Sequence, residues 1–190
     1  MNKTRLEAFS DGVLAIIITI MVLELKVPHG KEWQDLYPLC SKMLSYILSF
    51  TYVGIYWNNH HHLFHTVKHV SAGILWANLH LLFWLSLLPF ATAWAGENNF
   101  SQFPIILYGV LLFMCAIAYF ILSKVIIAEH GEHSLLAKAV GKIDLKGILS
   151  PVIYAVGVAL AFYLPLISFI LYFVVAIMWI IPDRRIEKVL

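Results

Sequence analysis

Long apolar runs alternate with short polar stretches along this chain, and six of the runs are near the length of a membrane span. They cover residues 6–25, 37–58, 71–92, 103–127, 147–164 and 166–182. A helix needs about 20 apolar residues to cross the hydrocarbon core of a bilayer. The last two runs meet at Pro165, which cannot continue a helical hydrogen-bond ladder. The pattern predicts an all-α integral membrane protein with six transmembrane helices, in one transmembrane domain over residues 1–190.

Composition agrees with this fold class. Hydrophobic residues make up 61% of the 190 residues, and the mean hydropathy is +0.82. An ordinary soluble domain is only about 45–50% apolar. The first apolar run is longer than the roughly 7–15 residues of a signal-peptide core, and no small-x-small cleavage site follows it. We therefore expect this run to remain in the protein as its first transmembrane helix.

The basic residues predict the orientation of the chain in the membrane, because cytoplasmic loops carry an excess of Lys and Arg. A cytoplasmic N-terminus leaves only Lys26, Lys31 and Lys42 outside. The other ten basic residues then lie inside: Lys3, Arg5, Lys68, Lys124, Lys138, Lys142, Lys146, Arg184, Arg185 and Lys188. The polar stretch 128–146 is too polar to span, and its apolar and basic residues predict a helix along the cytoplasmic interface. We expect both termini in the cytoplasm, and the even number of spans agrees with this.

The first apolar helix begins with polar residues that a plain membrane span does not need. Thr4 and Glu7 have the spacing of a capping box, which starts the helix near Arg5 and places Asp11 within it. A carboxylate near membrane depth costs a few kcal/mol unless it is paired or hydrated. Asp11 could cap or snorkel at the interface. The nearby Arg5, Ser10 and histidine-rich segment favour a paired network instead.

One face of the same helix carries a stripe with a single hydroxyl. At 100° per residue, Gly12, Ile16, Thr19 and Leu23 share this face, and Ile20 lies just beyond it. Periodicity alone favours ordinary packing against neighbouring helices, because every span in this chain is apolar on all sides.

Three segments resemble a known family of channels. The stretch 5–11 contains the pattern R-x-x-x-F-S-D, formed by Arg5, Phe9, Ser10 and Asp11. "YWNNHHHLFH" at 56–65 and "LPFATAW" at 88–94 follow at the ends of the second and third spans. These segments, and the six-span layout as a whole, resemble the bacterial form of the potassium channels related to lysosomal transmembrane protein 175.

The resemblance implies a homotetramer in the bacterial inner membrane, with the first helix lining a central pore for K⁺ ions. It implies a constriction of bulky apolar side chains instead of a carbonyl-type selectivity filter, and the chain has no T-V-G-Y-G stretch. Ile16 is then the leading constriction residue, Leu23 lies further outward, and Thr19 or Ile20 faces the pore between them. The remaining matched residues form a structural network at the end of the pore helix: Arg5, Phe9, Ser10, Asp11, Trp57 and His61.

The function predicted is a cation channel with modest selectivity for potassium. A ring of isoleucines cannot replace an ion's hydration shell, so an ion passes partly dehydrated or through a briefly wetted neck. Potassium gives up water more readily than sodium does. The alternative is a secondary transporter, proton-coupled through Asp11 and the histidines. Transporters typically have helices broken near the middle of the membrane, and the sequence places Pro89 only at the end of the third span.

The remaining candidates are weaker. His61, His65 and His69 are spaced i, i+4 and i+8 and could bind zinc, but no carboxylate or cysteine lies near them in the sequence. We expect no metal site and no cofactor. The chain has no H-E-x-x-H, G-x-S-x-G or phosphate-loop motif, so we expect no enzyme activity. The lipid bilayer, K⁺ and further copies of the chain are the expected partners, and nucleic acid is not.

Overall fold

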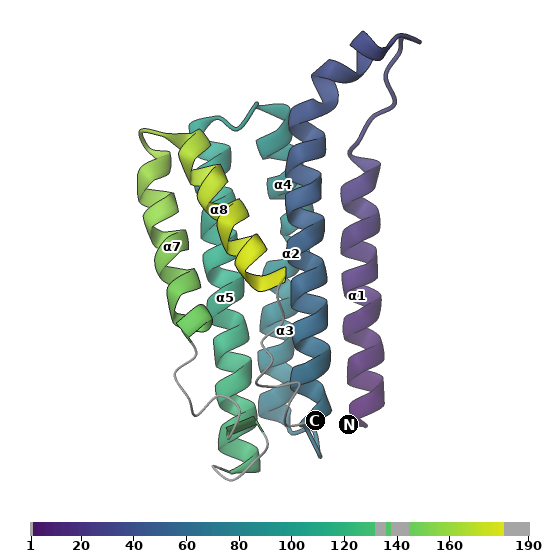
Figure 1. Ribbon diagram of the computed structural model, residues 1–190. Helices are drawn as coiled ribbons and strands as arrows, with labels where there is room; N and C mark the ends of the chain where they lie inside the picture. Colours follow the sequence, from purple (N-terminus) through teal and green to yellow (C-terminus); the bar gives the residue numbers. More distant parts are fainter. Residues whose placement is uncertain (1, 132–135, 138–144, 181–190) are drawn as a thin grey trace.

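The computed structural model describes residues 2–131, 136–137 and 145–180, and nearly all of these residues are helical (Figure 1). The elements are α1 (Lys3–Leu23), η1 (Trp33–Leu39), α2 (Cys40–His65), α3 (Ala72–Ser86), α4 (Leu88–Glu97), α5 (Gln102–His130), α7 (Leu145–Ala161) and α8 (Pro165–Ile180). The predicted all-α fold class is confirmed. Most of the predicted interfacial helix at 128–146 lies outside the described residues, as do Arg184, Arg185 and Lys188.

The start of α1 differs from the predicted one. Asn2, not Thr4, is the N-cap, and its Oδ1 accepts a hydrogen bond from the backbone N–H of Thr4 at 3.2 Å. An Asn side chain satisfies one of the backbone donors that a helix leaves unpaired in its first turn. The capping box predicted for Thr4 and Glu7 was therefore wrong, although Asp11 does lie inside the helix as expected.

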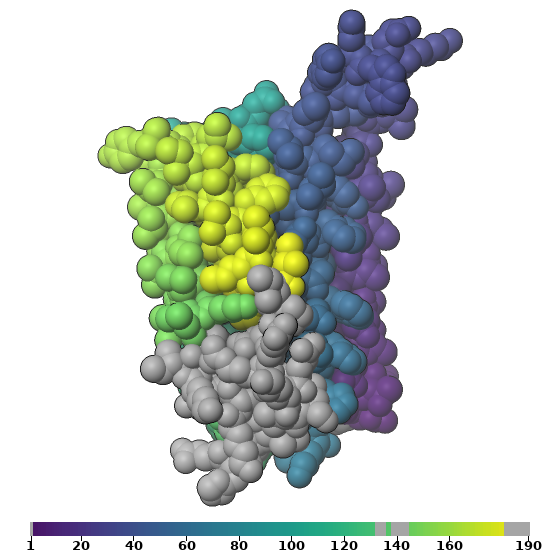
Figure 2. All heavy atoms as spheres, viewed as in Figure 1, coloured from purple at the N-terminus to yellow at the C-terminus, as the bar shows by residue number. Residues whose placement is uncertain are grey.

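The second helix runs seven residues past its predicted end at 58. α2 continues through the polar segment to His65, because backbone hydrogen bonds continue where the apolar run has already stopped. His60, His61, His62 and His65 therefore lie on α2, and only His69 lies beyond its end. The first residues of the predicted span, 37–39, belong to the 3₁₀ helix η1. The segment that carries η1 projects beyond the rest of the bundle (Figures 1 and 2).

The predicted third span is two helices in line. α3 and α4 meet at Leu87, and Pro89 lies in the first turn of α4, which begins at Leu88. Proline lacks the N–H that would continue the ladder. Together they form a 26-residue stretch, Ala72–Glu97, that is longer than the predicted 71–92. Pro89 thus lies well inside the span and not at its end.

Length and composition allow three of the described helical stretches to cross a membrane: Lys3–Leu23, Ala72–Glu97 and Gln102–His130. α7 and α8 are apolar but shorter, with 17 and 16 residues. α1 lies at one edge of the bundle beside α2, and α5, α7 and α8 lie on the other side of α2 (Figure 1). The buried core runs between these helices and includes Tyr52, Tyr108 and Tyr172.

The described basic residues divide between the two ends of the bundle. Lys3, Arg5, Lys68, Lys124 and Lys146 lie at or toward the end where α1 begins, whereas Lys26, Lys31 and Lys42 lie at the opposite end. Lys3 Nζ donates a hydrogen bond to the backbone carbonyl of His65 at 3.5 Å, which joins the start of α1 to the end of α2. The fold therefore keeps the two charge groups apart, as the predicted orientation requires.

Candidate pore helix and its polar network

α1 has one face packed inside its own chain and one face uncovered. Leu6, Ser10, Leu14, Ile17 and Met21 are buried and pack toward α2, α3 and α4. Their spacing of three or four residues follows one helical stripe. Val13 and Ile18 flank this stripe and are partly buried against the core. On the opposite side, α1 has no cover from the described part of the chain, so the apolar side chains there contact either lipid or further copies of this protein.

The predicted constriction residues all lie on the uncovered face. Ile16 is 58% exposed, Ile20 is 44% exposed and Leu23 is 71% exposed, and Thr19 is exposed as well. Ile17, one position along from Ile16, is only 3% exposed. Thr19 Oγ1 donates to the backbone carbonyl of Ile16 at 2.8 Å, which leaves the oxygen lone pairs of that hydroxyl available. The structure therefore leaves all four residues without packing partners among the described residues of their own chain, and their role in a constriction stays a prediction.

Ser10 anchors α1 through a chain of buried hydrogen bonds. Its hydroxyl donates to the carbonyl of Leu6 at 2.9 Å and accepts from Asn78 Nδ2 at 2.9 Å. Asn78 Oδ1 lies 2.7 Å from His60 Nε2, which must carry the proton because the amide oxygen only accepts. Ser10, Asn78 and His60 are all buried and come from α1, α3 and α2. This chain of bonds fixes the relative positions of three helices.

Sequence reasoning did not assign Asn78 and His60 to this network. A signal was present, since Asn78 interrupts an apolar run, and a polar side chain within a span usually has a specific partner. Its pairing with Ser10 could not be read from the sequence, because the two residues are 68 positions apart.

Asp11 lies beside this chain of bonds but has a different partner. Its Oδ1 accepts a hydrogen bond from Trp57 Nε1 at 3.0 Å, and the ring of Trp57 stacks near that of His61, with centroids 6.5 Å apart. Asp11, Trp57 and His61 are all exposed. The structure therefore joins three of the predicted network residues on the outer surface of the α1–α2 pair.

Two predicted members of the network are not joined to it within one chain. Phe9 is 51% exposed. Arg5 is exposed, and within residues 2–131, 136–137 and 145–180 it makes no ion pair or hydrogen bond through its side chain. Both side chains point away from the packed face of α1, on the same uncovered side of the chain as the predicted constriction.

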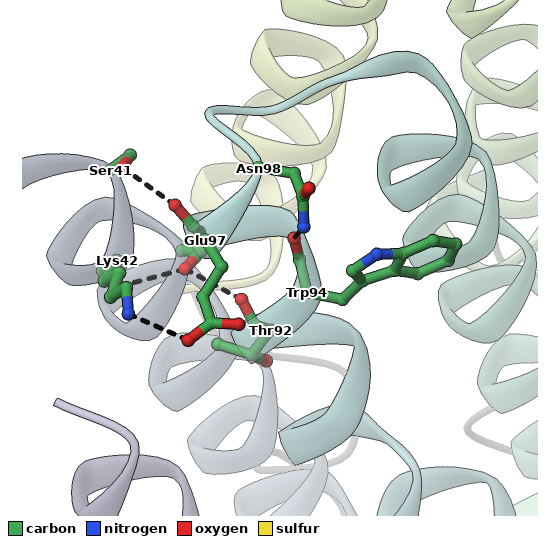
Figure 3. Close-up of polar contacts among 8 residues, drawn as sticks. Ser41, Lys42, Thr92, Trp94, Glu97 and Asn98 are labelled. Carbon is green, nitrogen blue, oxygen red and sulfur yellow. Dashed lines mark hydrogen bonds and ion pairs between the residues drawn. The ribbon is translucent and has the colours of Figure 1, made fainter. Parts of the chain in front are cut away.

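A second polar cluster, which sequence reasoning missed, clamps α2 to α4 at the opposite end of the bundle (Figure 3). Lys42 Nζ forms an ion pair with Glu97 Oε1 at 2.9 Å. Ser41 Oγ donates to the carbonyl of Gly96 at 2.8 Å, and Ser45 Oγ donates to the carbonyl of Thr92 at 3.1 Å. Gly96 permits this approach, because a side chain there would meet the backbone of Lys42. The cluster closes the outer ends of two helices that both contact α1.

The histidines do not form the face that a zinc site would need. His61 and His65 lie on α2, but α2 ends at His65 and His69 stacks on His130 with ring centroids 4.6 Å apart. Among the described residues, no group of three or more His, Cys, Asp or Glu side chains is placed to hold a metal ion.

Comparisons with known proteins find similar proteins that are named as channels. Residues 5–89 match the family model described as the endosomal/lysosomal potassium channel TMEM175. A protein of Chryseobacterium sp. (strain P1-3), named as a potassium channel, is 59% identical over 188 residues, which cover 99% of this chain and 97% of that protein.

A solved structure has the same fold as this chain. The crystal structure of a lysosomal potassium-selective channel TMEM175 homolog from Chamaesiphon minutus superposes with a TM-score of 0.82. It is 30% identical, and the match covers 96% of this chain and 97% of that one. A mouse protein named as the endosomal/lysosomal proton channel TMEM175 is 30% identical over 132 residues, which span 63% of this chain but 26% of the mouse protein.

Proposed function

Because this chain belongs to the family of potassium channels related to TMEM175, we propose that it is a potassium-selective cation channel with a pore lined by α1. It is a multi-pass membrane protein of all-α fold. The observation that carries the proposal is the division of α1 into a packed face and an uncovered face. The uncovered face presents Ile16, Thr19, Ile20 and Leu23, which a monomer leaves without a packing partner.

The proposed assembly is a homotetramer. A single chain contains one helix of this kind and cannot surround an axial path with it, whereas cyclic symmetry places copies of the same face around one axis. Each chain contributes one transmembrane domain with six spans, counting α3 and α4 as one. Both termini lie in the cytoplasm of a bacterial cell, and the bilayer is its inner membrane. The location of Lys3, Arg5 and Lys68 at one end, where α1 begins and α2 ends, supports this orientation.

The proposed constriction selects by dehydration and not by coordination. Ile16 and Leu23 are seven residues apart on one face, about 10 Å along the helix axis. Rings of their side chains present no polar atoms to an ion, so passage requires loss of water or transient wetting. Thr19 lies between them, and its oxygen lone pairs are available for weak contacts with an ion. No ring of backbone carbonyls is needed in this arrangement.

The polar network holds the pore helix and does not contact ions in this proposal. The bonds from Ser10 through Asn78 to His60 are buried within one chain, and Asp11 is held by Trp57. Arg5 and Phe9 have no such partner among the residues that the structure describes, and they lie on the uncovered side, where an adjacent subunit would supply their partners. The network thereby fixes the rotation of α1 that turns Ile16 toward the axis.

The transporter alternative has one structural argument in its favour. The break at Leu87 and Pro89 lies inside a membrane-length stretch, as broken helices of transporters do. However, the break is in the α3–α4 pair, and α1 is continuous from Lys3 to Leu23. The relatives are also named as channels. We therefore retain the channel as the proposed function.

Reversal potentials distinguish the proposed channel from the secondary transporter. The purified protein is reconstituted in planar bilayers, and currents are recorded in opposing K⁺ and Na⁺ gradients at equal pH and then with a pH difference. A channel gives a reversal potential displaced toward the K⁺ equilibrium potential that is insensitive to the pH gradient. A reversal potential that follows the proton gradient in a fixed ratio would support the coupled transporter.

A further inference from the structure

A cavity of about 300 Å³ lies in the half of the bundle where α1 begins, between α2, α5, α7 and the last turn of α8. No described residue of α1 lines it. Its volume falls at the lower end of the roughly 300–1,000 Å³ that is typical of small-molecule sites. Figure 1 shows that α8 ends well short of the lower end of α5, and the residues of α2 and α5 that line the cavity lie near this end of the bundle.

The cavity changes in character along its length. Its inner part, toward the middle of the bundle, is lined by aromatic and apolar side chains that include Tyr52, Tyr154 and Ala116. Its outer part, toward the end of α5, is lined by Asn59, Ser123 and Lys124. Such a gradient fits a ligand with a long apolar part and one polar end.

The mouth of the cavity carries a positive charge. Lys124 is exposed, and its Nζ lies 5.3 Å from the centre of the Phe120 ring. Over the described ranges the single ion pair is Lys42–Glu97 at the far end of the bundle, so no described carboxylate neutralises Lys124. Phe120 and Ile148 flank the cavity and are 59% and 60% exposed. A cation beside exposed apolar groups favours an anionic amphiphile.

One wall is held rigidly in place. Trp179, at the end of α8, donates from Nε1 to Ser150 Oγ on α7 at 2.7 Å. Tyr154 donates to the hydroxyl of Tyr52 at 3.2 Å across the inner end. These bonds between α2, α7 and α8 hold this wall in place, and the cavity is present without a ligand.

We propose that this cavity binds one acyl chain of an anionic phospholipid from the cytoplasmic leaflet, with the lipid phosphate beside Lys124. The volume of about 300 Å³ is close to that of a single acyl chain, so the second chain of the lipid stays in the bilayer. A phospholipid is favoured over a free fatty acid because the surrounding leaflet supplies it continuously. This lipid site depends on the proposed function in one respect, the orientation of the chain in the membrane. That orientation places this end of the bundle in the cytoplasm and α1 away from the lipid.

Native mass spectrometry of the detergent-purified protein tests the site. Equal amounts of phosphatidylglycerol, phosphatidylcholine with the same chains, or oleate are added, and the bound species are counted as collision energy rises. We expect one phosphatidylglycerol per chain to survive energies that remove phosphatidylcholine. Lys124→Gln should reduce its bound population about fivefold, the effect of one lysine near an anionic lipid, and Lys124→Arg should retain it.

Two further variants distinguish binding inside the cavity from attraction of the lipid to basic residues on the surface in general. Ala116→Phe fills the inner part and should reduce binding with all lysines in place, whereas Lys68→Gln removes a charge at the same end of the molecule but outside the cavity and should not. Equal retention of both phospholipids, or no effect of Lys124→Gln and Ala116→Phe in a correctly assembled protein, would overturn the proposal. Binding of oleate without phosphatidylglycerol would overturn the choice of a phospholipid. None of these measurements uses current. A protein that does not conduct would therefore contradict the proposed channel function but not the proposed lipid site.

Discussion

At the scale of single residues, two adjacent isoleucines of α1 have opposite environments. Ile16 is 58% exposed and Ile17 is 3% exposed. The apolar composition of this helix could not distinguish them, because both fit a membrane span equally well. The packed stripe that contains Ile17 does distinguish them, because it fixes which face α1 turns toward its own chain. In the proposed channel, the pore lining therefore comes from the side that includes Ile16, Thr19 and Leu23.

Truncation of Ile16 tests this assignment. Ile16→Ala removes a β-branched side chain that is stiff at χ1, so the neck should widen and wet more readily. We expect a larger macroscopic current and a reversal potential closer to zero in a K⁺/Na⁺ gradient, because dehydration would no longer discriminate. Ile18→Ala is the matched control, since Ile18 is partly buried and points about 200° away. A change in Ile18→Ala with none in Ile16→Ala would mean that the other face lines the pore.

The polar network gives a second prediction at the same scale. Asn78 is buried and bonded to both Ser10 and His60, whereas Asp11 is exposed and bonded to Trp57. Asn78→Ala leaves two buried polar groups without their partner, at a cost of about 1–3 kcal/mol for each. An exposed pair contributes roughly 0–1 kcal/mol. Asn78→Ala should therefore lower the thermal midpoint of the purified protein more than Asp11→Ala does.

The comparison also tests whether Asp11 has a direct role in conduction. Both variants should keep the K⁺/Na⁺ selectivity of whatever protein assembles, since neither residue contacts ions in the proposed function. An Asp11→Ala protein with normal stability and assembly but no current would identify Asp11 as an ion or proton site. That result would also strengthen the transporter alternative.

At the scale of helices, apolar runs located the spans but not their ends. The polar segment Asn58–His65 continues α2, because helix formation depends on backbone bonds that hydropathy does not record. The opposite error occurred at Pro89, where an uninterrupted apolar run hides a change from α3 to α4. The partners of Ser10 could not be predicted at all, since they come from helices whose neighbours only the tertiary fold defines.

Helix packing on the far side of α2 depends on glycine. The ring of Tyr172 on α8 fits against Gly109 on α5 and Gly157 on α7, where an added Cβ would overlap it. Gly109→Ala and Gly157→Ala should each destabilise the protein by about 1–3 kcal/mol through overpacking. Gly54→Ala is the matched control on α2, because a Cβ there meets nothing within 4 Å.

The measurement is the temperature at which each variant loses its size-exclusion peak after heating. Gly54→Ala should equal or slightly exceed the parent, since alanine restricts the unfolded chain more than glycine does. A Gly109→Ala protein as stable as Gly54→Ala would show that α8 packs against α5 less closely than the structure indicates.

At the scale of the whole molecule, the uncovered surface of α1 is what a single chain cannot account for. Ordinary lipid-facing helices are apolar, but α1 also leaves Arg5, Asp11 and Thr19 exposed on a helix long enough to cross a membrane. Exposure of such groups to hydrocarbon is costly. Contact with other subunits and a hydrated path removes that cost. The polar clusters at the two ends of the bundle already hold α2, α3 and α4 where they pack against α1.

We therefore predict that the protein is a homotetramer. Native mass spectrometry in a detergent that preserves K⁺ flux should give a complex of four 21.6 kDa chains, and light scattering should agree. Leu23→Cys, at the outer end of the uncovered face, should form disulfide-linked dimers on mild oxidation, because fourfold symmetry brings its copies around one axis. Met21→Cys, which is 1% exposed within its own chain, should not form them. Cys40 is exposed, so both variants are made with Cys40→Ser. A monomer that still conducts would contradict the assembly, and cross-linking through Met21→Cys instead of Leu23→Cys would show that α1 is turned the other way.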